Sequence, residues 1–160
     1  MKKFIGLLLT CFLLLCTASA GYCSGTLDEQ DAFDTYIGKS KSVVRVIAPN
    51  YKEVKGTDYF IVDRVEYVND GYAFLFVDFE DTNTVQAVGL MMDPNTAKLA
   101  FDGDIFKFFS YSLSAFGLDA ANLTEVHRLD ENYVYGIFVS NILCTCRVVD
   151  IAYTTDCHQY

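Results

Sequence analysis

Two carboxylates near the middle of the chain have a spacing that could support acid and base chemistry. Asp78 and Glu80 are two residues apart in a segment predicted to be a strand, so their side chains are expected to share one face. Glycoside hydrolases use such a pair, one group donating a proton and the other acting as base or nucleophile. The same residues also adjoin predicted turns, where solvated acids are common. A small acid/base hydrolase is therefore the alternative hypothesis, and no catalytic residue is assigned.

Motifs of the common catalytic centres are absent from the sequence. The chain has no G-x-S-x-G, no H-E-x-x-H and no glycine-rich phosphate loop. Its two histidines are His127, near the end of a predicted short helix, and His158, two residues before the C-terminus. Neither position is typical of a catalytic base, and the sequence favours a non-catalytic protein.

Four cysteines follow the first 20 residues: Cys23, Cys144, Cys146 and Cys157. In an exported protein an even number favours two disulfides, and four thiols allow three pairings. Cys144 and Cys146 share one face of a predicted strand, and a bridge between them would be strained. We therefore expect one of them to pair with Cys157 and the other with Cys23, which would staple both ends of the domain to the last strand.

Metal binding and redox activity are the competing interpretations of these cysteines. Cys144, Cys146, Cys157 and His158 could in principle hold zinc, and a Cys-x-Cys pair could be redox-active. Neither arrangement has the usual Cys-x-x-Cys spacing, and no twelve-residue calcium loop is present. The sequence predicts structural disulfides, with no metal and no cofactor.

Three tyrosines cluster in one predicted hairpin: Tyr59, Tyr67 and Tyr72. Rows of tyrosine on a sheet form contact surfaces for proteins or sugars, because the ring gives a large contact area at low entropic cost. Tyrosine is also an ordinary strand residue beside a core. The three residues are candidate binding residues.

The first 20 residues have the layout of a secretory signal peptide. Lys2 and Lys3 precede an apolar run from residue 4 to residue 16, and small residues up to Ala20 suit a cleavage site. The run is shorter than a membrane span, and Leu15 and Tyr22 are too bulky for the residues that precede a lipidated cysteine. We expect an exported protein, periplasmic or extracellular, with no membrane span after cleavage.

Composition limits the classes of partner. The chain carries a net charge of −9, and the leader contains two lysines and no acid, so the mature chain is more acidic still. Nucleic acids and anionic membrane surfaces bind through clusters of Lys and Arg, which this chain lacks. A protein, peptide or glycan partner is expected, and no nucleic acid.

Hydrophobic periodicity and turn residues predict the order of the elements. A capping box at Thr26 and Glu29 begins a helix that ends at Gly38. Further helices are expected at 105–116, where Asp102 or Asp104 can act as the cap, and at 120–128. Strands are expected at 43–47, 59–68, 72–80, 85–92, 97–101, 133–139 and 143–153. Asn69–Gly71 is the turn of the clearest hairpin, and further turns are expected at Asp93–Asn95 and near Ser140 and Asn141. A helix followed by strands occurs twice, but no residue-level repeat accompanies it, and no duplication is inferred.

These elements fit one exported α+β domain over residues 21–160. Short turns require antiparallel neighbours, and the apolar content is sufficient for a core of its own. The expected fold is an antiparallel sheet of about four to six strands packed against two or three helices and stapled by disulfides. The function that we expect is a non-catalytic binding or envelope-associated module that uses a sheet face.

Overall fold

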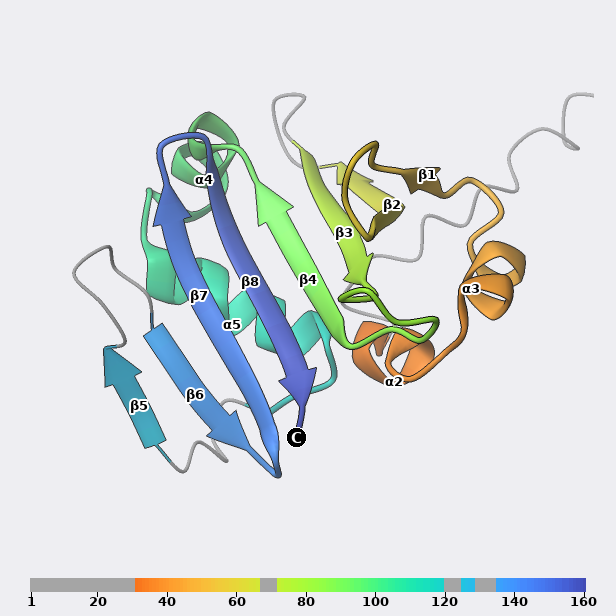
Figure 1. Ribbon diagram of the computed structural model, residues 1–160. Coiled ribbons are helices and arrows are strands. Elements are labelled where there is room, and N and C mark those ends of the chain that lie inside the picture. Colours follow the sequence, from red (N-terminus) through yellow and green to blue (C-terminus); the bar gives the residue numbers. More distant parts are fainter. Residues whose placement is uncertain (1–30, 67–71, 120–124, 129–134) are drawn as a thin grey trace, which may run out of the picture.

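The computed structural model describes residues 31–66, 72–119, 125–128 and 135–160, which form an antiparallel sheet packed against helices (Figure 1). The strands are β1 (Lys52–Glu53), β2 (Tyr59–Glu66), β3 (Tyr72–Asp78), β4 (Ala87–Met92), β5 (Glu125–Arg128), β6 (Tyr135–Val139), β7 (Ile142–Val149) and β8 (Ala152–Gln159). The helices are α2 (Ala32–Tyr36), α3 (Lys41–Ile47), α4 (Pro94–Phe101) and α5 (Ile105–Ala115). The α+β class is confirmed, but the described residues contain eight strands and four helices, more than expected.

Several predictions concern segments outside these residues. The signal peptide, Cys23, the capping box at Thr26 and Glu29, Tyr67 and the turn at 69–71 all lie there. They remain predictions, but the helix expected to run from the capping box to Gly38 is seen as α2, which begins at Ala32 with Asp31 as its N-cap.

The strands form two four-stranded meanders that meet at the centre of the sheet. Their order is β1-β2-β3-β4-β8-β7-β6-β5, and the order is symmetric about the contact between β4 and β8. These central strands pair from Ala87 opposite His158 to Met92 opposite Tyr153. Among the described residues, each meander follows two helices, so the repeated order of elements seen in the sequence is present in the fold.

The core lies between the sheet and the helices on one of its faces. In Figure 1, α5 lies behind β7 and β8. Phe108 and Leu113 of α5 are buried against Leu75, Leu90 and neighbouring side chains of the sheet. Burial of each such side chain contributes about 1.5–3 kcal/mol to folding.

Helix α3 occupies the segment 43–47, where the sequence predicted a strand. Ser40 begins the helix, because its hydroxyl accepts a hydrogen bond from the backbone N–H of Val43 at 3.4 Å. Only Val44 of the helix is buried, and Val46 is 78% exposed. The strand prediction was wrong because strand propensity reflects packing in a sheet, whereas this segment has a local cap that begins a helix and most of its side chains are exposed.

Helix α4 replaces the strand predicted at 97–101. The side chain of Asp93 accepts hydrogen bonds from the backbone N–H groups of Asn95 and Thr96 at 3.0 and 3.1 Å, and Pro94 occupies the first turn. An acidic cap followed by proline is a favourable helix start, because proline has no N–H to satisfy and its φ angle suits a helix. The sequence interpretation assigned these residues to a turn.

The C-terminal half differs from prediction at two places. Residues 125–128 form β5 at the edge of the sheet, paired with β6, and not the end of a helix. The strand predicted at 143–153 is two strands, because the chain turns at Asp150 and Ile151 and Val149 pairs with Ala152. The prediction therefore missed β8, which is central in the sheet.

Other predictions are confirmed. Strands β2 and β3 form the expected antiparallel hairpin, with Tyr59 opposite Asp78. Ser140 and Asn141 join β6 to β7 with φ angles of 50° and 68°. Helix α5 begins at the cap Asp104. None of the described helices is long and apolar enough to cross a membrane.

Candidate functional site

The sheet has a second face that none of the described helices covers in front of β4, β7 and β8 (Figure 1). On β4, Val88 and Leu90 are buried in the core. Side chains alternate along a strand, so Ala87, Gly89 and Met91 are directed to the opposite face. We call this opposite surface the open face.

A groove of about 500 Å³ lies on the open face. Its lining comes from β2, β3, β4, β7 and β8, together with the segment between β1 and β2 and the turn between β7 and β8. This volume lies within the range of typical ligand sites, about 300–1,000 Å³. Most of its lining is apolar.

Small side chains on the central strands create the groove. Ala87 and Gly89 of β4 lie opposite His158 and Asp156 of β8, and Thr154 of β8 lies opposite Met91. Ala87, Gly89, Ala152 and Thr154 offer little side-chain volume. Longer side chains stand on the flanking strands. The result is a trough along the middle of the sheet.

An aromatic pair forms the wall on the β2 and β3 side. The ring centroids of Tyr59 and Phe76 are 5.5 Å apart. The Phe76 ring lies over the backbone of Gly89, because a Cβ atom at position 89 would be 2.1 Å from Phe76 Cζ. Glycine is required for this arrangement, and the ring in turn forms part of the lining.

Asp156 of β8 is the most unusual polar group in the groove. It lies opposite Gly89 on one side and opposite Thr145 on the other. Its Oδ1 atom is buried and has no hydrogen-bond donor among the described residues. A buried oxygen without a donor costs about 1–3 kcal/mol, so it marks a place where a donor from outside would be favourable.

Burial raises the pKa of the Asp156 carboxyl above its ordinary value. The charges of Arg147 and His158 oppose this increase in pKa, as does a hydrogen bond from Thr145, while the charge of Asp78 adds to it. The carboxyl therefore loses its proton less readily than an exposed aspartic acid does.

The rim near the end of β8 contains the acids that the sequence singled out. Asp78 lines the groove, and its Oδ1 accepts a hydrogen bond from the backbone N–H of Glu80 at 2.9 Å. Glu80 Oε1 is 3.1 Å from Nδ1 of His158, which is also a lining residue. Strand β3 ends at Asp78 and Glu80 has a φ angle of 45°, so the two acids do not share a strand face as predicted. The expected pair is replaced by Asp78 and Asp156 in one cavity.

The three candidate tyrosines are not brought together in the groove. Tyr59 lines it and is 39% exposed. Tyr72 lies on the same face of β3 as Phe76 but outside the lining, where it packs on Phe74 and on Arg64, with the guanidinium 4.4 Å from its ring centroid. Tyr67 lies outside the described residues.

Sequence reasoning missed most residues of the groove. Phe76, Met91, Arg147 and Asp156 all line it. Side chains alternate along a strand, so a strand predicted from Ala152 onward would have placed Asp156 on the same face as Thr154 and His158. The predicted last strand ended at residue 153, so this pattern was not used. No local signal identifies β8 as the partner of β4.

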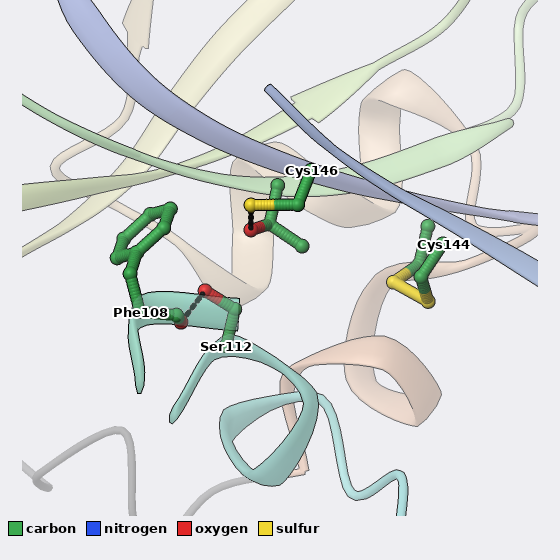
Figure 2. Close-up of a disulfide and its surroundings, with 6 residues drawn as sticks. Phe108, Ser112, Cys144 and Cys146 are labelled. Carbon is green, nitrogen blue, oxygen red and sulfur yellow. Dashed lines mark hydrogen bonds between the residues drawn. A yellow bond between two sulfur atoms is a disulfide. The ribbon is translucent and has the colours of Figure 1, made fainter. Parts of the chain in front are cut away.

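One of the expected disulfides is present. Cys144 and Cys157 face one another on β7 and β8 and form a bond of 2.00 Å (Figure 2). Cys146 has a buried free thiol beside this bridge, with the hydroxyl of Thr155 at 3.4 Å from its sulfur. The expected second bridge would join Cys146 to Cys23; because Cys146 is a free thiol in the structure, the structure does not support that bridge.

The chemistry of Cys146 differs from that of a redox thiol. Burial raises its pKa to about 12, with a smaller increase from the charge of Asp156. Reactive cysteines have low pKa values, because the thiolate is the nucleophile. The part of the chain that the structure describes also contains no group of His, Cys, Asp and Glu side chains that could hold a metal ion.

Comparison with models of protein families, with curated proteins and with solved structures finds no match for this chain. The candidate site therefore stands on its own geometry: an apolar groove with an aromatic wall and a buried carboxylate, on the uncovered face of the sheet.

Proposed function

We propose that this protein is an exported, non-catalytic binding module that recognises a segment of a partner protein in the groove on the open face. The observation that supports this proposal most directly is the trough formed by small residues on the two central strands. Its walls are formed by side chains of a rigid sheet, so the apolar surface is preorganised and binding costs little ordering entropy.

Photo-crosslinking followed by a purified binding assay tests this proposal. A photoreactive phenylalanine at position 59 is expected to capture a partner from the cell envelope. The captured protein would then be purified and titrated by calorimetry against groove variants. We expect Tyr59→Ala and Met91→Ala each to weaken its affinity about tenfold, since each removes apolar contact area worth about 1.4 kcal/mol.

Tyr72→Ala is the matched control, because it makes the same truncation on the same face outside the groove lining. It should leave the affinity unchanged. Equal losses for Tyr72→Ala and Tyr59→Ala, or no loss for either groove variant, would reject the groove as the binding site.

Export is part of the proposal. The leader has the layout of a signal peptide, and the Cys144–Cys157 disulfide is compatible with an oxidising compartment. N-terminal sequencing of the protein from fractionated cells should give Gly21 as the first residue, in the periplasmic or extracellular fraction. An intact precursor that begins at Met1 in the cytosol would contradict export.

A hydrolase is the second candidate, and one observation favours it. Burial raises the pKa of Asp156, and a second carboxylate, that of Asp78, lines the same cavity. Acid and base pairs in enzymes have pKa values that their surroundings push apart. Release of nitrophenol from a panel of nitrophenyl glycosides, lost in both Asp78→Asn and Asp156→Asn, would support it; no release above buffer would dispose of it.

A further inference from the structure

The groove contains two carboxylates that no cation of the described chain neutralises by direct contact. Asp78 of β3 and Asp156 of β8 both line it, and none of the described Lys and Arg side chains forms an ion pair with either. The rim histidine, His158, is 3.1 Å from Glu80, a different acid. Arg147 also lines the groove and its charge acts on Asp156, so the two acids leave an excess of negative charge in the groove that is available to a ligand.

The two carboxylates flank the same part of the trough. Strand β4 lies between their strands, with Asp78 opposite Ala87 and Asp156 opposite Gly89, so the two acids are diagonal neighbours across β4. The Phe76 ring lies over Gly89 beside them. Two strand spacings amount to about 10 Å between the backbones of β3 and β8. One positively charged group entering the trough can interact with both carboxylates.

We infer that the groove takes a basic side chain, lysine or arginine, from the bound segment of the partner, with its cation between Asp78 and Asp156 and its aliphatic stem against Phe76 and Tyr59. This inference rests on the proposed function, because it requires a partner segment in the groove. It adds the chemical class of side chain that the groove selects.

A basic side chain fits the two properties that distinguish the groove. Lysine and arginine have long apolar stems that pack on apolar walls while their charged end reaches polar groups. The Tyr59 and Phe76 rings also attract a cation, by about 0.5–1 kcal/mol at an exposed site. A donor on the incoming side chain would satisfy the buried oxygen of Asp156 after a small rotation of that carboxylate.

Other occupants fit less well. An acidic side chain would meet two carboxylates of like charge. A purely apolar side chain would bury the Asp156 oxygen more deeply and still leave it without a donor. The net charge of −9 also favours encounter with a basic segment over an acidic one.

Three acetylated, amidated and fluorescently labelled peptides of the form Val-Ala-X-Ala-Val test the inference, with X as lysine, norleucine or glutamate. Norleucine has nearly the shape of lysine without its charge. In fluorescence anisotropy titrations of the wild-type protein at pH 7.5, we expect the lysine peptide to bind at least about tenfold more tightly than the norleucine peptide. The glutamate peptide should bind more weakly than both.

Variants of the two acids then test whether these residues cause the preference for lysine over norleucine. Asp156→Asn and Asp78→Asn should each reduce the advantage of lysine over norleucine by several-fold while leaving the affinity for norleucine similar, which a folding defect could not produce. Asp63→Asn is the matched control, because Asp63 is an exposed acid of β2 outside the groove lining. It should preserve the preference.

Equal binding of the lysine and norleucine peptides, or a preference that survives in both groove variants, would overturn the inference. So would equally tight binding of free n-butylammonium, since a small amine would then be the ligand. If none of the peptides binds while Tyr59→Ala still weakens the purified partner, the basic side chain is rejected and the proposed function stands.

Discussion

Asp156 combines an acidic side chain with a buried position between two strands, and this combination makes the stability of the protein depend on pH. Burial favours the protonated form, so the folded protein holds this proton more tightly than the unfolded chain does. The free energy of unfolding should therefore fall as the pH rises from the ordinary value of 3.8 through the pKa of the folded state. Each tenfold difference in proton affinity corresponds to about 1.4 kcal/mol.

Asp156→Asn should remove this decrease in the free energy of unfolding with rising pH, because asparagine has a similar shape and no charge. We expect the variant to be more stable than the wild-type protein near pH 7 and no more stable below pH 3.8. Urea denaturation across this pH range measures both curves. Parallel curves for the two proteins would show that Asp156 titrates alike in the folded and unfolded states.

Cys146 should be protected from alkylation for a related reason. With a pKa of about 12, only about one thiol in 10⁴ is ionised at pH 8 in the folded protein. Iodoacetamide should label Cys146 at least about 1,000-fold more slowly in the native state than in guanidinium chloride, because reaction requires the thiolate. Mass spectrometry of tryptic peptides measures this ratio, and native labelling at the rate of an exposed thiol would contradict the buried position.

Among the elements, α4 depends on one capping residue. Asp93 accepts hydrogen bonds from two backbone N–H groups and from the hydroxyl of Thr96, and these bonds lower the pKa of its carboxyl. Asp93→Ala should reduce the free energy of unfolding by about 0.5–2 kcal/mol at pH 7. Asp93→Asn should lose much less, because asparagine caps about as well, and equal losses in urea denaturation would show that the cap contributes little.

The turn between β6 and β7 offers a stabilising change. Ser140 and Asn141 both have positive φ angles, as in the tight turns that suit hairpins. Serine is strained there, whereas glycine adopts this conformation freely. Ser140→Gly should raise the free energy of unfolding by about 0.5–1 kcal/mol, and Ser140→Ala, which keeps a Cβ atom, should not. A midpoint in urea that does not move for Ser140→Gly would contradict the strain.

Local patterns in the sequence correctly predicted those elements that are determined by residues within the element itself. The hairpin of β2 and β3, the start of α5 at Asp104 and the turn at Ser140 and Asn141 are of this kind. The run at 43–47 was misassigned because its β-branched residues favour a strand, whereas the Ser40 cap begins a helix in which only Val44 is buried. For α4 the signal was present, in the cap and proline at 93 and 94, and the interpretation missed it.

The groove was mostly unpredictable for a different reason. It exists only because β4 and β8, far apart in the sequence, pair in a register that places Gly89 opposite Asp156. Nothing local to either residue specifies that pairing. Tyr59 was identified because its type and position alone suggested a contact surface, whereas Asp156 became a candidate only through its surroundings.

At the scale of the whole molecule, the pairing of β4 with β8 joins the two meanders into one sheet. The register extends over the full length of β4, and core side chains of both meanders belong to one buried cluster with side chains of the helices. Neither meander has a separate core, because Leu90 of the first and Cys157 of the second belong to one buried cluster. The described fold should therefore unfold as a single cooperative unit.

Leu90→Ala tests this cooperativity, because Leu90 is fully buried in β4, the strand of the first meander that lies at the centre of the sheet. The truncation should lower the free energy of unfolding by about 2–5 kcal/mol. In native-state hydrogen exchange, the slowest amides of β7, in the second meander, should lose as much protection as those of β3, in the first, since both exchange through global unfolding. Loss of protection in β3 with β7 unchanged would show instead that the two meanders unfold independently, and that the β4–β8 contact joins two separately stable units.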